Sequence, residues 1–366
     1  MSRGVVLVAA FVAACHSNNA RSDAAGDTPV DEMNPIDAAP ACTLPVLTTH
    51  VATLSGCSQA GTADGPRGVA LFSNPVNVAL GGSGEAYVAD FDSSRIRKVQ
   101  PDGTVTTIIQ QASFTHPFGM AFTPEGNLYV ETDDDDNGLH TIASGTVWRI
   151  HPANATATVV ARDLGRPRGL AVLPNGTIAM ADYMHHVVEI LDPATGAVTV
   201  LAGMMDTAGY MDGVGSAAKF AQPWDVAVLG NGDLAVSDFD NQVIRRVTPG
   251  GVVSLYAGTV GTMGMADGTL LTATFDQPKG LAVDRAGNLY VTENGNHDVR
   301  RVSAAGAVGR IAGSGTAGWV DSDTATAAEL YGVEGLDVSA DGTRIVVADG
   351  NVGDGTMFNH VRVVVP

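Results

Sequence analysis

The chain has 366 residues, of which 45% are hydrophobic and only 16% are charged. Lysine and arginine total 20 against 39 acidic residues, which gives a net charge of −19. This acidity excludes the basic surface that binding to nucleic-acid phosphates requires, and the many apolar residues exclude disorder over most of the chain. Glycine supplies 44 residues, about 12% against a usual ~7%, so we expect a fold with many turns.

The first 14 residues have the pattern of an export signal. A single basic residue, Arg3, precedes an apolar run over 4–14. That run is shorter than the ~20 residues that span a bilayer, but it fits a signal peptide. It ends at Val12-Ala13-Ala14-Cys15, which resembles the lipobox of bacterial lipoproteins. The resemblance implies lipidation of Cys15 and, because residue 16 is not aspartate, an outer-membrane location. An ordinary secretory signal is the alternative.

Residues 15–42 are predicted to be a flexible tether. The segment 16–40 is rich in Ala, Asp, Asn and Ser and has no apolar period, so it cannot bury enough surface to offset the entropy of ordering. Two further cysteines follow, Cys42 and Cys57. In an oxidising envelope we expect them to form a disulfide, and two free thiols are the alternative.

From residue 43 to the end, the chain repeats one unit six times. Five units begin at a proline and the sixth begins at a valine: Pro75, Pro117, Pro167, Pro223, Pro278 and Val333. Each unit consists of short alternating runs separated by Gly, Asn and Pro turns, which is typical of four β-strands. Six such units predict an all-β fold, a six-bladed β-propeller.

The two ends of this region are predicted to close the ring. The sixth unit stops after its third strand, over 360–365, whereas the segment 50–56 matches the fourth strands of other units. An N-terminal strand that completes the last blade would pair edges that are otherwise exposed.

The repeat resembles the NHL-repeat family of six-bladed propellers. The best copies are Gly287-Asn288-Leu289-Tyr290-Val291-Thr292-Glu293 with Asn296-His297, and Asp238 with Asn241-Gln242 and Ile244-Arg245. The resemblance covers about residues 50–366 and implies the fold. It leaves the function open, because such propellers include lyases, lactonases and binders of protein or RNA.

The residue that follows each proline is predicted to lie at the mouth of the central channel. These positions vary in chemistry, and with one inner-strand acid they form the predicted binding set: Phe118, Arg168, Trp224, Asp225, Lys279 and Glu334. Aromatic, cationic and anionic groups on one rim suit a protein, peptide or glycan ligand. The alternative is that the rim varies because nothing constrains it.

Three polar residues interrupt the small and apolar positions of the inner strands: Asn77, Asp225 and Asp337. A buried polar group must be hydrogen-bonded, so we expect them to bond to the backbone of a neighbouring blade. The competing hypothesis is a calcium-dependent hydrolase or lyase similar to propeller lactonases. The histidine zinc site of the related peptide-amidating lyases is not found at the matching positions.

Two groups of acids remain. Asp133, Asp135 and Asn137 match the start of a calcium-binding loop, and a solvated acidic loop is the alternative. Asp90, Asp182, Asp238, Glu293 and Asp349 recur at one position of nearly every unit. A catalyst is needed once, so recurrence indicates a structural role.

Together these features predict a monomeric, lipid-anchored propeller of the cell envelope that binds a protein, peptide or glycan and requires no cofactor, with calcium as the one candidate. A metal-dependent enzyme is the alternative.

Overall fold

A computed structural model describes residues 42–44, 47, 49–350 and 358–366 of the chain. The expected signal peptide, Cys15 and the tether up to residue 41 lie outside these residues. Within the described ranges, we find no helix that is both long enough and apolar enough to cross a bilayer.

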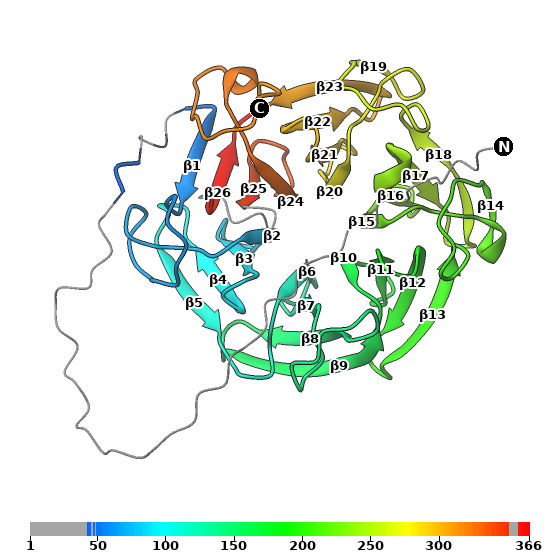
Figure 1. Ribbon diagram of the computed structural model, residues 1–366, viewed down its shortest axis with the longest axis horizontal. Helices are drawn as coiled ribbons and strands as arrows, with labels where there is room; N and C mark the ends of the chain where they lie inside the picture. The colour runs from blue at the N-terminus through cyan, green and yellow to red at the C-terminus, as the bar shows by residue number, and fades with distance from the viewer. Residues whose placement is uncertain (1–41, 45–46, 48, 351–357) are drawn as a thin grey trace, which may run out of the picture. The chain divides into compact units, whose positions relative to one another are not determined.

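Six antiparallel sheets surround a central axis, which confirms the six-bladed propeller (Figure 1). In chain order the first three blades consist of β2 (Pro75–Leu80), β3 (Ala86–Asp90), β4 (Arg95–Val99) and β5 (Val105–Ile109); β6 (Pro117–Phe122), β7 (Leu128–Thr132), β8 (Gly145–His151) and β9 (Thr156–Leu164); and β10 (Pro167–Val172), β11 (Ile178–Asp182), β12 (Val187–Asp192) and β13 (Ala197–Ala202).

Blades 4 and 5 each have four main strands and a two-residue fifth strand that the preceding linker adds to the outer edge. They consist of β15 (Pro223–Val228), β16 (Leu234–Asp238), β17 (Val243–Val247) and β18 (Val252–Ala257) with β14 (Gly213–Val214), and of β20 (Pro278–Val283), β21 (Leu289–Glu293), β22 (Asp298–Val302) and β23 (Ala307–Ala312) with β19 (Gly268–Thr269). Short single-turn 3-10 helices also lie in the described loops: η1 (Gly215–Ala217), η2 (Phe239–Asn241) and η3 (Ala325–Ala327).

The sixth blade is completed by the N-terminal strand, as the sequence predicts. It orders β1 (Val51–Ser55), β26 (His360–Val364), β25 (Ile345–Gly350) and β24 (Gly332–Val338). β1 pairs antiparallel with β26, and Val51 lies opposite Val364. The ring is therefore closed by backbone hydrogen bonds between the two ends of the repeat region.

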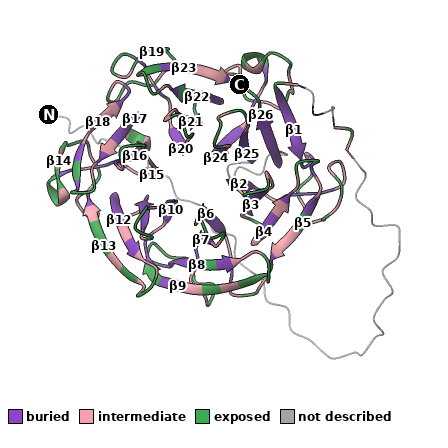
Figure 2. Ribbon diagram, turned by 180° about the vertical axis from the view of Figure 1, so that it is seen from behind, coloured by how far each residue is buried: buried purple, intermediate pink, exposed green. Residues whose placement is uncertain are grey.

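The strands nearest the axis are largely buried, whereas an outer strand such as β13 is largely exposed or half-buried (Figure 2). The outermost strand of blade 6, β1, is the exception, because all five of its residues are buried. Adjacent blades approach closely where the inner strands carry glycine. A Cβ atom added to Gly280 would lie 2.5 Å from the carbonyl oxygen of Glu334 on the next blade. The small positions of the sequence repeat are therefore required by packing between blades.

A buried arginine ties four of the blades to their linkers. In blade 5, Arg300 donates to Glu293 at 3.0 Å and to the linker residue Asp267 at 2.8 Å. The other three sets have the same arrangement: Arg97 with Asp90 and Asp64, Arg245 with Asp238 and Asp212, and Arg362 with Asp349 and Asp321. The recurring acids of these blades thus have the structural role that their recurrence predicts.

Blades 2 and 3 depart from this arrangement. The position of the arginine, fixed by its register opposite the second strand, is Trp148 in blade 2 and Glu189 in blade 3. Trp148 donates its indole N–H to Thr132 Oγ1 at 2.9 Å. In blade 3, Asp182 instead contacts His185 Nδ1 at 2.9 Å. The repeat is therefore least regular on this side of the ring.

Candidate functional site

The residues predicted at the channel mouth do converge, because each follows the first residue of an inner strand. We call Phe118, Arg168, Trp224 and Lys279 the mouth cluster. The guanidinium of Arg168 lies 4.1 Å from the ring centre of Phe118 and 5.1 Å from that of Trp224. The ammonium of Lys279 lies 4.2 Å from the ring centre of Trp224. Cations over aromatic faces stabilise such a cluster electrostatically.

The mouth cluster fills its end of the channel with side chains. Trp224 stacks on Phe239, with ring centres 5.2 Å apart, and meets Tyr183 edge-on at 5.0 Å. Phe118 is 2% exposed and Trp224 is 8% exposed. Lys279, also buried, forms an ion pair with Glu334, the sixth predicted rim residue. The side chains of the predicted rim thus pack against one another, and they expose little surface to a ligand in this conformation.

Acidic groups of blade 2 lie directly beside Arg168. Asp133 Oδ2 accepts a hydrogen bond from Arg168 Nη2 at 2.8 Å, and Asp133 Oδ1 is buried without a partner. The carboxyl group of Glu131 is also fully buried. Burial and the neighbouring Asp133 raise the pKa of Glu131 well above its usual value. Buried acidic groups of blade 2 therefore lie beside the cation of Arg168 at this side of the mouth.

We expected all three polar inner-strand residues to bond to the backbone of a neighbouring blade, and Asp225 and Asp337 do so. Asp225 Oδ2 accepts the amide hydrogen of Leu281 on the next blade, and Asp337 Oδ2 accepts that of Leu80 on blade 1. Asn77 Oδ1 accepts from the amide of its neighbour Val78. Burial raises the pKa of Asp225 to about 7 and that of Asp337 to about 6. All three residues line a cavity of about 220 Å³ within the channel.

The predicted calcium ligands of blade 2 have different partners in this structure. Asp133 is buried against Arg168, whereas the half-buried Asp135 accepts hydrogen bonds from the amides of Asn137 and Leu139 in its own loop. The loop instead brings a different acid, Asp134, between two histidines. His116 Nδ1 lies 2.8 Å from Asp134 Oδ2, and His140 Nδ1 lies 2.5 Å from Asp134 Oδ1.

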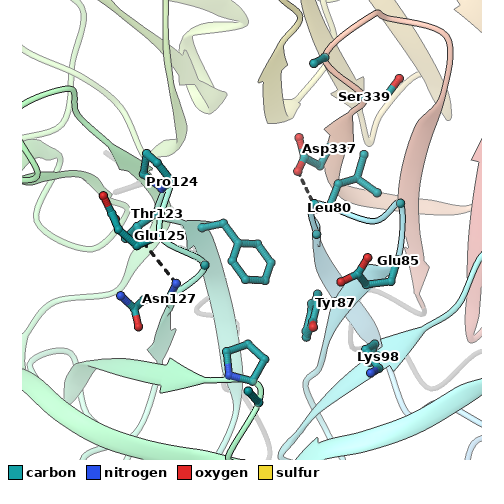
Figure 3. Close-up of a pocket in the computed structure, with 18 of the residues that line it drawn as sticks. Leu80, Glu85, Tyr87, Lys98, Thr123, Pro124, Glu125, Asn127, Asp337 and Ser339 are labelled. Carbon is teal, nitrogen blue, oxygen red and sulfur yellow. Dashed lines mark hydrogen bonds between the residues drawn. The ribbon is translucent and has the colours of Figure 1, made fainter.

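A large hollow lies at the hairpin ends of the inner strands. We call it the hairpin-face groove: a cavity of about 920 Å³ bounded by the hairpins at 80–87, 122–127 and 151–154 and by residues 337–344. Figure 3 shows Tyr87 and Lys98 of blade 1 across from Thr123 and Asn127 of blade 2. Tyr87 and Phe122 meet edge-on with ring centres 5.0 Å apart.

Sequence reasoning missed this groove. Its aromatic residues lie at alternating strand positions, and the sequence does not distinguish these from core positions. The hairpins that border the groove also have the sequences of ordinary turns. Phe122 also borders a neighbouring cavity of about 660 Å³ and the channel cavity. The hollowed surface therefore extends from the groove to the axis.

Cys42 and Cys57 are joined by a disulfide whose Cα atoms lie 6.0 Å apart. Because Cys57 lies two residues after the end of β1, the bond holds Cys42 next to the closing strand. It thereby links the residues before the propeller to the propeller itself.

Fold and repeat together define this protein as a six-bladed β-propeller built from blades with a shared motif. The particular repeat follows from comparison with a family model: residues 220–246 and 275–301 match the NHL repeat, so the chain carries NHL repeats.

Comparison with known proteins adds distant relatives. The chloroplastic Protein SUPPRESSOR OF QUENCHING 1 of Arabidopsis thaliana is 28% identical over 177 residues, which are 48% of this chain and 14% of that protein. An auxiliary nutrient binding protein from Bacteroides thetaiotaomicron superposes with a TM-score of 0.67 at 16% identity, covering 86% of this chain and 75% of the other. Virginiamycin B lyase from Staphylococcus aureus gives 0.52 at 12% identity, covering 80% and 95%. The two structural likenesses show the fold alone.

Proposed function

We propose that this chain is a binding protein of the bacterial envelope, held at the outer membrane by lipid on Cys15, and that its ligand is a glycan seated in the hairpin-face groove. The observation that carries the proposal is the groove itself, whose volume of about 920 Å³ is in the range of ligand-binding cavities. The binding role of a propeller with a similar fold, the Bacteroides nutrient binding protein, supports it.

The side chains of the groove favour a neutral, hydroxyl-rich ligand. The aromatic pair Tyr87 and Phe122 offers apolar surface, while Glu85 and Lys98 supply charges of opposite sign at the same wall. A ligand with one net charge would leave one of these groups unmatched, whereas hydroxyl groups both donate and accept hydrogen bonds. The overall charge of −19 further opposes polyanionic ligands.

The binding test uses the full chain, purified from membranes in detergent, on an array of neutral bacterial and plant oligosaccharides. Any hit is measured by titration calorimetry. We expect Lys98→Ala and Asn127→Ala to weaken binding about tenfold or more each, the scale of one lost hydrogen bond to a charged or buried group. Tyr256→Ala, which alters an outer strand of blade 4, is the matched control and should bind as the wild type does.

Variants of the mouth cluster, compared with Lys98→Ala, show which end of the channel binds the ligand. If Arg168→Ala or Trp224→Ala abolishes binding while Lys98→Ala has no effect, the ligand binds at the mouth cluster and the groove proposal is wrong. Binding only to a protein or peptide, with no glycan bound, would likewise overturn the glycan assignment.

One observation favours the enzymatic alternative. Asp225 faces the channel cavity with its pKa raised by burial to about 7, and a carboxyl group with such a pKa suits a general base at neutral pH. Asn77, Asp225 and Asp337 would then act with a calcium ion. Measured lactone hydrolysis that is lost in Asp225→Asn, together with calcium bound at one equivalent, would establish this role over simple binding.

A further inference from the structure

Blade 2 carries a cluster of His116, Asp134 and His140 that has no counterpart in blades 1, 3, 4 and 5, whose residues the structure describes in full. Its second and third strands are joined by twelve residues, 133–144, whereas four residues join them in blades 1, 3, 4 and 5. The extra residues supply Asp134 and His140. The third member, His116, precedes Pro117, at a position that holds Asn74, Gln222 and Gln277 in blades 1, 4 and 5.

These departures coincide in space. One ligand-type atom from each of His116, Asp134 and His140 lies within 4.8 Å of the other two. The carboxylate is buried, with 5% of its side chain exposed, while the imidazoles are 37% and 49% exposed. The carboxylate therefore forms the base of the cluster and the two rings flank it at the surface.

We propose that His116, Asp134 and His140 bind a zinc ion. Two imidazole nitrogens and one carboxylate oxygen are a ligand set that zinc uses in sites with an open coordination position, whereas calcium takes oxygen ligands only. Zinc bonds of about 2.0–2.1 Å in a tetrahedron place ligand atoms ~3.3 Å apart. Modest rotation of two half-exposed rings reaches that spacing from the present contacts of 2.5 and 2.8 Å.

Arg166 controls access to the site. Its Nη2 lies 2.6 Å from His140 Nε2 and has only protons to donate, so in this state His140 accepts at Nε2 and carries its own proton on Nδ1, facing Asp134. A neutral imidazole that binds zinc through Nδ1 carries its proton on Nε2. Arg166 must therefore move away when the metal binds.

The site adjoins the mouth cluster but does not depend on the function proposed above. Asp133, next to Asp134 in the chain, holds Arg168, and the ring of His116 lies 4.8 Å from that of Phe91, which in turn meets Phe118 at 6.0 Å. A bound zinc ion with a free coordination position would thus be next to the plugged end of the channel.

Zinc binding to the chelator-treated full chain tests the proposal, by calorimetry and by the visible absorption of cobalt(II) added in place of zinc. We expect one equivalent, with His116→Ala and His140→Ala each weakening binding at least tenfold, as loss of a ligand or its support does. Arg166→Ala should bind zinc more tightly than the wild type. His151→Ala, on a hairpin of the opposite face, is the control and should be unchanged.

Circular dichroism and melting of each variant verify that it folds. The proposal is overturned if the folded wild type shows no saturable zinc binding below about 100 μM, a weak limit for a specific protein site, or if the two histidine variants keep the full equivalent. It is also overturned if calcium displaces zinc and Asp135→Asn removes the site, because the ligands would then be the oxygens of the loop.

Discussion

The carboxylate of Asp225 accepts the amide hydrogen of Leu281, 2.8 Å away on the inner strand of the next blade. Asp337 makes the same kind of bond to the amide of Leu80, at 2.7 Å. At two of the six seams between blades, a carboxylate therefore reaches across to the backbone of the neighbouring blade. Both acids also face the channel cavity. The side chains that join neighbouring blades are therefore also those that the enzymatic alternative would use.

Asp225→Ala is expected to destabilise the propeller by about 1–3 kcal/mol, because the amides of Leu281 and Val226 lose their acceptor in a buried seam. Chemical denaturation monitored by fluorescence measures the loss. Asp323→Ala, an exposed linker residue, is the control and should stay within about 0.5 kcal/mol. Equal effects of the two substitutions would contradict the seam.

Glu189→Gln is expected to stabilise the protein at pH 8 by about 1–3 kcal/mol. Burial first, and then the neighbouring Asp182, raises the pKa of Glu189 from 4.5 to about 7. The folded state therefore binds this proton more tightly than the unfolded state does. The resulting stabilisation is full below pH ~4.5 and is lost as pH rises through about 7.

The gain from Glu189→Gln should accordingly shrink between pH 8 and pH 5.5, as melting temperatures at several pH values would show. Glu125→Gln, on an exposed hairpin, should show no such pH dependence. A gain that does not depend on pH would mean that the pKa of Glu189 is the same in the folded and unfolded states, which would contradict the prediction.

Arg300→Ala is expected to cost about 3–5 kcal/mol, because it leaves the buried carboxylate of Glu293 without its cation. The next residue provides the comparison: Arg301 is exposed on the same strand, and Arg301→Ala should change stability by less than about 0.5 kcal/mol. Thermal unfolding of both variants measures the difference. Similar melting temperatures would show that the arginine clamp does not hold the blade.

Replacement of Cys42 and Cys57 by serine is expected to lower stability by about 3 kcal/mol, the chain-entropy value for a loop of ~15 residues. Reducing agent should lower the melting temperature of the wild type by the same amount and leave the double variant unchanged. If reductant has no effect on the wild type, the bond contributes nothing to the fold.

The sequence was sufficient to predict the fold because the signals for each blade lie within a short stretch of the chain. Five of the six blades repeat the proline start and five repeat the acid near the end of the second strand. These features, like the Gly turns, act on residues nearby in the chain. The closing strand was predictable for the same reason: the segment 50–56 carries the pattern of the fourth strand that the sixth unit lacks.

The surface available to a ligand was decided by tertiary packing. Phe118 and Trp224 were correctly expected to converge, but only the structure shows that both are buried. Phe118 packs against Phe91 and Trp224, and Trp224 packs against Phe239 and Tyr183. The groove between Tyr87 and Asn127 and the cluster of His116, Asp134 and His140 join separate hairpins and loops. Repetition along the chain therefore determined the blades, whereas the sites depend on distances between side chains that only the closed ring brings together.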